Sequence, residues 1–170
     1  MSTTEIKLLK YPEGVIEEIE FSNSHGSAPV IWDAMAQKYL GLQPFHYNFH
    51  TDKLWPLWKD LNIPEHQRAV LTMTYDNVVV EKKDFLRAAK DIEKFLEDFP
   101  VNLEYENHWP EIQKIFLENP DCDAIGFHWT SVNSDPFQGS WNDDIEDYDP
   151  MNWGNFWSMY KKLDTFKNKE

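Results

Sequence analysis

One stretch constrains the fold of this chain more than any other. Between residues 82 and 99 apolar side chains return every three or four positions, and charged side chains fill most positions between them. That spacing puts the apolar groups on one side of an α-helix, which Pro100 stops. The predicted stripe consists of Phe85, Leu86, Ala89, Ile92, Phe95, Leu96 and Phe99. A helix with one apolar side needs other elements to complete a core.

Other helices are predicted from residues that start and stop them. Ser27 is a residue type that caps helix beginnings, and Gly41 is one that follows helix ends. Asp149 followed by Pro150 gives the same kind of beginning near the end of the chain. The predicted helices are 28–40, 82–99, 110–118 and 149–163, with a short one at 55–61 and a loop at 42–52.

Strands are predicted where apolar and polar side chains alternate. The clearest alternation is at 69–75, where Thr72 and Thr74 lie on the polar face. Turn residues between positions 10 and 15 make the first two strands a hairpin. The predicted strands are 5–10, 15–21, 69–75 with a short extension at 78–80, 101–105 and 124–132.

Helices mixed with strands of this kind favour an α+β fold. Strands with one buried face are typical of antiparallel or mixed sheets, because purely parallel sheets are buried on both faces. We therefore expect a single α+β domain over residues 1–170, with an antiparallel or mixed sheet of about four or five strands. Helices are expected to pack mainly on one face of that sheet, and the polar tail at 165–170 is expected to fray.

The charge of the chain is strongly negative and unevenly spread. Sixteen basic and thirty acidic residues give a net charge of −14, and residues 101–160 contain twelve acidic residues and one basic residue. A surface this acidic repels the phosphates of nucleic acids and anionic lipids. We expect no nucleic-acid or membrane partner, and a basic protein is the partner that the charge favours.

The cysteine content and the apolar runs favour a cytoplasmic protein. Cys122 is the only cysteine, so the chain forms no internal disulfide, as suits a reducing compartment. The first residues lack the apolar stretch of a signal peptide, and no apolar run is long enough to cross a membrane. Because the chain has no nucleotide-binding or hydrolase motif, no cofactor is expected and an enzyme is not favoured.

The stretch best suited to recognition is the loop at 133–149, which is rich in acidic and aromatic side chains. Its tryptophan and tyrosine side chains are of the kind that anchor protein interfaces. The carboxylates between them would steer a basic partner and set its orientation. The candidate partner-binding residues are Trp141, Asp143, Asp144, Glu146, Asp147 and Tyr148.

Three histidines are the candidates for chemistry. His128 lies in the predicted strand 124–132, and its imidazole could act as a general acid or base with Asp135 nearby. His46 and His50 are four residues apart, a spacing that suits a metal site only on a helix. Since their segment is predicted to be a loop and lacks the glutamate of the HExxH motif, no metal is assigned to it.

Three functions are compatible with the sequence. The first is a module that docks or neutralises a basic protein through the loop at 133–149. In composition the chain is similar to bacterial immunity and inhibitor proteins, which neutralise basic toxins or enzymes through acidic, aromatic surfaces. The second is a small-molecule-binding protein or hydrolase-type enzyme with a pocket around His128, His46 and His50. The third is a subunit of a homo-oligomer that buries some of the eight tryptophans.

Overall fold

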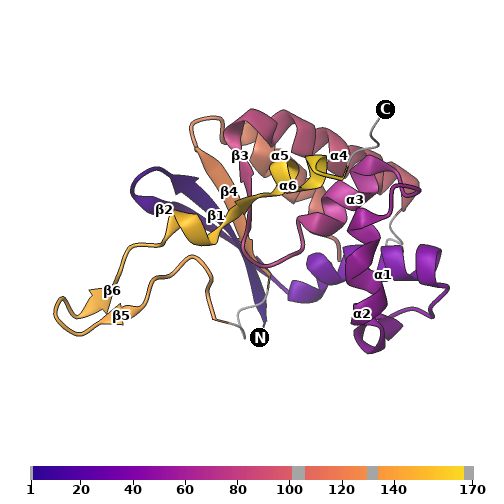
Figure 1. Ribbon diagram of the computed structural model, residues 1–170, viewed down its shortest axis with the longest axis horizontal. Helices are drawn as coiled ribbons and strands as arrows, with labels where there is room; N and C mark the ends of the chain where they lie inside the picture. The colour runs from indigo at the N-terminus through magenta and orange to yellow at the C-terminus, as the bar shows by residue number, and fades with distance from the viewer. Residues whose placement is uncertain (1, 101–105, 130–133, 167–170) are drawn as a thin grey trace.

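The computed structural model describes residues 2–100, 106–129 and 134–166. In these ranges five strands form one mixed sheet in the order β2-β1-β4-β3-β7 (Figure 1). Each neighbouring pair is antiparallel except β3 and β7, which run parallel. The predicted α+β fold with a mixed sheet is confirmed. The strands are β1 (Thr3–Lys10), β2 (Gly14–Ser22), β3 (Val78–Glu81), β4 (Ala124–His128) and β7 (Trp157–Ser158).

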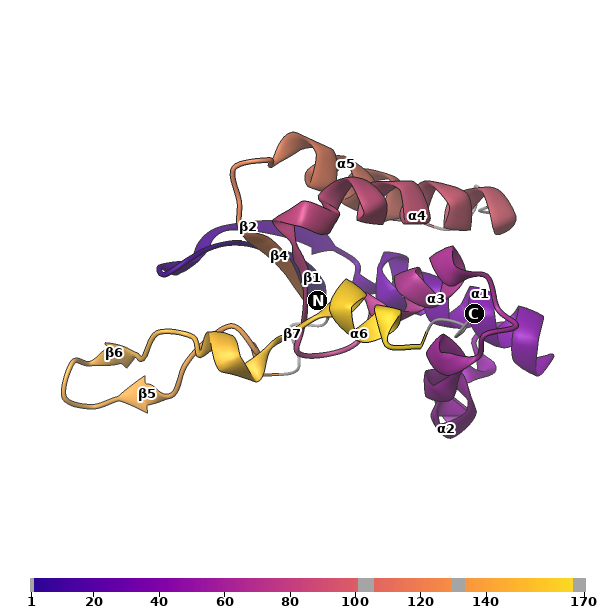
Figure 2. The ribbon, with the colours of Figure 1, turned by 45° about the horizontal axis from the view of Figure 1, so that its top comes forward.

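Helices α4 and α5 lie side by side over one face of the sheet, as Figure 2 shows. The predicted helices at 28–40, 82–99 and 110–118 are confirmed. Measured against the thickness of a bilayer, every helix in the described ranges is too short or too polar to span it. The α-helices in these ranges are α1 (Ala28–Leu40), α2 (Thr51–Leu54), α3 (Glu65–Thr72), α4 (Phe85–Asp98), α5 (Trp109–Glu118) and α6 (Met159–Asp164). Short 3-10 turns are Ser24–Gly26, His46–Phe49, Trp55–Lys59, Lys82–Asp84 and Trp153–Asn155.

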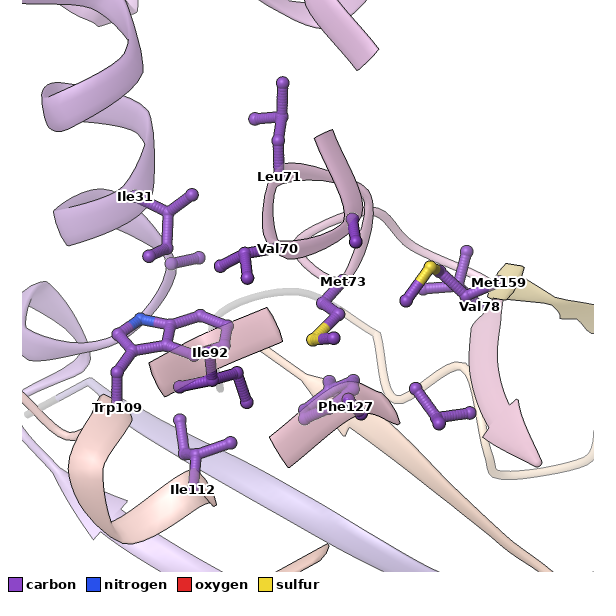
Figure 3. Close-up of a cluster of buried hydrophobic side chains, with 14 of the residues drawn as sticks. Ile31, Val70, Leu71, Met73, Val78, Ile92, Trp109, Ile112, Phe127 and Met159 are labelled. Atoms are coloured by element: carbon purple, nitrogen blue, oxygen red, sulfur yellow. The ribbon is translucent and has the colours of Figure 1, made fainter. Parts of the chain in front are cut away.

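The main core fills the space between the sheet and these helices (Figure 3). Phe127 of β4 stacks on Trp129, with ring centroids 4.7 Å apart and planes 10° apart. Trp129 stacks in turn on the fully buried Trp109 of α5, at 5.4 Å. Each stacked pair adds to the free energy gained by burying the rings, so α5 is fixed against the centre of the sheet.

One residue of the predicted stripe on α4 faces solvent. Leu86 is 74% exposed, whereas Phe85, Ala89, Ile92 and Phe95 are buried. A helix turns by about 100° per residue, so Leu86 points well away from Phe85 and outside the arc that the other apolar side chains share.

The strand predicted at 69–75 is wrong, because most of this segment is the end of α3. The alternation predicts a polar face that contains Thr72 and Thr74, but both are buried. Thr72 donates its hydroxyl to the Arg68 carbonyl at 2.7 Å, and Thr74 donates to the Leu71 carbonyl at 2.6 Å. A threonine that hydrogen-bonds to its own helix tolerates burial, so its polarity gives no information about the exposed face. The predicted extension at 78–80 is the strand, β3.

The helix predicted at 149–163 is also wrong over its first two thirds. Only Met159–Asp164 is α-helical, after a 3-10 turn and strand β7. The predicted N-cap, Asp149, instead accepts a hydrogen bond of 2.9 Å from the side chain of Asn142. Trp157 donates its N–H to the Asn77 carbonyl at 3.1 Å, which joins this segment to the edge of the sheet. Backbone groups that would have paired within a helix therefore form hydrogen bonds with the edge of the sheet beside β3.

The other face of the sheet is covered by irregular chain. We call residues 134–140 and 149–156 together the strap. Side chains of the strap complete a second, smaller core, which consists of Leu9, Val79, Ala124, Phe137 and Met151, with Val15, Trp153 and Phe156 packed against it. Three predictions lie outside the described residues: the strand at 101–105, the strand 124–132 beyond Trp129, and the tail from residue 167.

Candidate functional site

The loop predicted to bind a partner contains a projecting β-hairpin, which we call the arm and which comprises residues 141–148. In it β5 (Trp141–Asn142) pairs antiparallel with β6 (Asp147–Tyr148). The base of the hairpin is closed by a hydrogen bond of 2.8 Å that the Asp149 N–H donates to the Ser140 carbonyl. In Figures 1 and 2 the arm extends away from both the sheet and the helices. Residues that were predicted as an irregular loop are therefore a defined structural unit.

Local hydrogen bonds hold the turn of the arm. The Asp144 N–H donates to the side-chain oxygen of Asn142 over 2.9 Å, an arrangement that fixes chain reversals. Trp141 donates its indole N–H to Asp143 at 2.9 Å, and its ring lies edge-on to Tyr148 with centroids 5.2 Å apart. These contacts order the side chains without burying them, so the arm presents a preformed surface.

The arm brings all six candidate residues together and leaves them accessible. Trp141 is 54% exposed and Tyr148 is 44% exposed, although tryptophan is on average a highly buried residue. Between positions 134 and 158 the sequence contains six acidic residues and no lysine or arginine. The exposed acidic residues of the arm are Asp143, Asp144, Glu146 and Asp147.

Sequence reasoning missed the apolar residue in the turn of the arm. Ile145 occupies the turn and is 59% exposed, more than either aromatic side chain. The next residue, Glu146, has a φ of 51°, a left-handed conformation that residues other than glycine rarely adopt. The available signal was an isoleucine in the middle of an acidic run.

The strap packs tightly where the arm begins and ends. Phe137 lies directly against Gly126 of β4, and a Cβ at position 126 would overlap its ring. Phe137 also stacks on Phe156, with centroids 4.7 Å apart and planes 8° apart. At the base of the arm, a Cβ at Gly139 would overlap the carbonyl of Asp149. The two segments of the strap are therefore packed on each other and on the sheet.

A buried lysine joins the strap to the sheet through an ionic cluster, which we define as Lys7, Glu5, Glu18 and Asp135. Lys7 is fully buried, and its Nζ lies 2.6 Å from Glu5, 2.7 Å from Glu18 and 2.9 Å from Asp135. Burial alone lowers the pKa of Lys7, but the hydrogen bonds that it donates to the three carboxylates outweigh burial and raise this pKa above its ordinary value. Lys7 therefore stays protonated, and its ion pair with Asp135 holds the strap against the sheet.

His128 lies beside the ionic cluster. It is buried, pairs with Glu5 across β1 and β4, and has its Nδ1 3.4 Å from Glu5 Oε2. The hydrogen bond from Lys7, with a smaller contribution from His128, holds the pKa of Glu5 below its usual range. Ligand atoms of Glu5, His128 and Asp135 lie within 4.8 Å of one another, a grouping that could hold a metal ion. Both carboxylates already bind the Lys7 ammonium, so a metal would have to displace an internal cation.

The other two candidate histidines lie elsewhere in the fold. His46 begins the 3-10 turn His46–Phe49, and His50 follows it directly, so the two do not share a continuous α-helix. A cavity of about 900 Å³ opens between α1 and the end of α4, and Phe45 and Tyr47 line it. Neither His46, His50 nor His128 is among its lining residues.

The chain matches no family model, no curated protein and no solved structure. Its function has to be inferred from the side chains that the fold presents.

Proposed function

We propose that this protein is a binding module that docks a basic partner protein through the arm, in the manner of an immunity or inhibitor protein. The observation that carries the proposal is the arm itself, which holds an exposed aromatic pair among carboxylates and projects from the body of the fold. The proposal includes a cytoplasmic location, where a reducing environment would keep Cys122 a thiol.

The chemistry of the arm supports docking in two ways. Trp141 and Tyr148 offer large, rigid surfaces, and such side chains contribute most of the binding free energy in many interfaces. The acidic side chains around them provide a negative field that raises the association rate of a basic partner. Because hydrogen bonds within the arm already order it, binding would lose little conformational entropy.

The proposal can be tested by reversing charges on the arm. The immobilised protein is used to capture proteins from a host lysate, and each captured protein is purified and its affinity measured by titration calorimetry. The variant D143K/D144K/D147K is compared with a control, E93K/E97K/E118K, whose substitutions lie at exposed positions of α4 and α5. Both variants change the net charge from −14 to −8, so they differ only in where the charge is reversed.

The expected result is a basic partner whose binding is abolished by the arm variant and largely retained by the control. Equal loss in both variants would show that net charge alone is responsible. Capture of no basic protein, or a captured protein indifferent to the arm variant, would overturn the proposal.

A second candidate function is a small-molecule binder or hydrolase-type enzyme that uses His128. The contact of Glu5 with His128 favours it, because a carboxylate beside an imidazole orients the ring for proton transfer. A thermal-shift screen of metabolite-sized compounds tests it. This candidate requires a compound that stabilises the wild type and fails to stabilise the variant H128N.

A further inference from the structure

The turn of the arm presents a large apolar side chain at its far end. Ile145 lies between Asp144 and Glu146, and it belongs to neither buried cluster of the described residues. At 59% exposure it is more accessible than Trp141 behind it. Glu146 has a left-handed backbone, which residues other than glycine rarely adopt. The turn that carries this isoleucine is therefore locally strained.

The shape of the arm restricts the surface that it can meet. β5 and β6 are two residues each, and the turn between them is the outermost part of a narrow projection (Figure 2). A narrow, convex element buries an apolar tip only by entering a concave surface. Asp143, Asp144 and Glu146 flank Ile145 and would reach the rim of that concavity, where unpaired carboxylates would lose solvation unless basic groups receive them.

We propose that Ile145 is a plug that enters an apolar pocket with a rim of lysine or arginine side chains on the partner. This inference rests on the proposed function, and it adds the kind of surface that the partner must have. Trp141 and Tyr148 then pack on the partner's surface beside the pocket and keep their role as aromatic anchors.

The cavity between α1 and the end of α4 is not such a pocket for the arm of a second copy. The cavity between α1 and α4 is lined by Asp33, Asp98 and Glu106 against one lysine, Lys38. An arm that carries four carboxylates would meet like charge there, which is unfavourable. We therefore place the complementary pocket on a basic protein rather than in this cavity of a second copy.

The plug is tested with single substitutions in the complex with the purified partner. I145A should weaken binding at least tenfold, which is the loss expected when a central apolar anchor is truncated. I145L, which keeps the apolar volume, should stay within about threefold of the wild type. L86A is the matched control, because Leu86 is an equally apolar and still more exposed side chain on α4, and it should leave the affinity unchanged.

Photo-crosslinking locates the contact. Benzoylphenylalanine is placed at position 145, 148 or 86 of the 170-residue chain, and adducts are mapped by mass spectrometry. Position 145 should react with apolar residues in a concavity of the partner that is bordered by basic residues, and position 86 should give no adduct.

The outcomes separate the two proposals. If the arm charge-reversal variant abolishes binding while I145A does not, or if position 148 alone gives an adduct, the plug is wrong and docking through the arm stands. If no captured protein depends on the arm, both proposals fail.

Discussion

Lys7 is the residue whose removal should show most about how the strap is held. A fully buried ammonium bound by three carboxylates is stable only as a set, because a lone buried charge is poorly solvated. We expect K7M to lower the free energy of unfolding by about 3 kcal/mol, since it leaves partly buried carboxylates without their cation. Urea denaturation measures this, with K10M at an exposed position of the same strand as control. Equal stability of K7M and wild type would contradict an ionic tie.

The same cluster predicts a pH dependence with a definite sign. The pKa of Glu5 is lowered in the folded state, chiefly by the hydrogen bond from Lys7, so the unfolded chain takes up this proton more readily. The stabilisation is therefore present above about pH 4.5 and is lost as the pH falls through the folded-state pKa. Between about pH 5 and pH 3 the wild type should lose more stability than K7M. Parallel denaturation curves for the two proteins in this range would exclude the effect.

Gly126 and Phe137 form a second tie between sheet and strap. A methyl group at position 126 would overlap the Phe137 ring, so G126A should cost about 1–3 kcal/mol by displacing it. In an F137A background the same substitution should cost less than about 0.5 kcal/mol, because the obstacle is gone. A double-mutant cycle by urea denaturation checks this. A cost that persists in F137A would mean that position 126 needs glycine for another reason.

At the scale of elements, the sequence correctly predicted the segments whose own residue pattern determines their secondary structure. The stripe at 82–99 became α4, and the turn residues at 10–15 produced the hairpin of β1 and β2. Segments whose environment comes from distant chain were predicted wrongly. Contacts with α4 and α6 bury α3 and its Thr72, and before α6 the edge beside β3 converts expected helix into strand β7. The elements that pack on α3 and pair with β7 cannot be recognised from the local sequence pattern.

The arm is an element that should be dispensable for folding. Its residues contact mainly one another, and Ser140 and Asp149 at its base are already hydrogen-bonded. Replacing residues 141–148 by Asn-Gly, a pair suited to a tight turn, should change the free energy of unfolding by no more than about 0.5 kcal/mol. Circular dichroism and urea denaturation measure this, and partner binding should be lost. A large loss of stability would give the arm a structural role instead.

At the scale of the whole molecule, the sequence likewise predicted the local part of the candidate site and missed the part that distant segments build. Composition and charge were enough to propose the loop at 133–149 and six residues of the arm as a candidate site, since the acidic and aromatic side chains lie close together in the sequence. The ionic cluster was out of reach, because Lys7, Glu18 and Asp135 come from segments whose register the sequence leaves open. The sheet brings them together on the face that the strap covers, and the arm projects from that strap.

The placement of charge on the molecule leads to a prediction about association rates. A partner approaching from solution senses charges within about 10 Å of the contact at moderate salt, so carboxylates on the arm should matter more than those on α4 and α5. For the purified partner, the association rate constant should fall at least tenfold between about 0.02 M and 0.5 M salt, while the dissociation rate constant changes little.

Stopped-flow kinetics with two variants of equal net charge identify which charges are responsible. The control E93K/E97K should keep most of the salt dependence of the wild type, and D144K/D147K, which has the same net charge of −10, should lose much of it while still binding measurably. If all the variants show a slope that follows net charge alone, the partner is attracted by the acidic surface as a whole. The arm would then provide contacts without guiding the encounter.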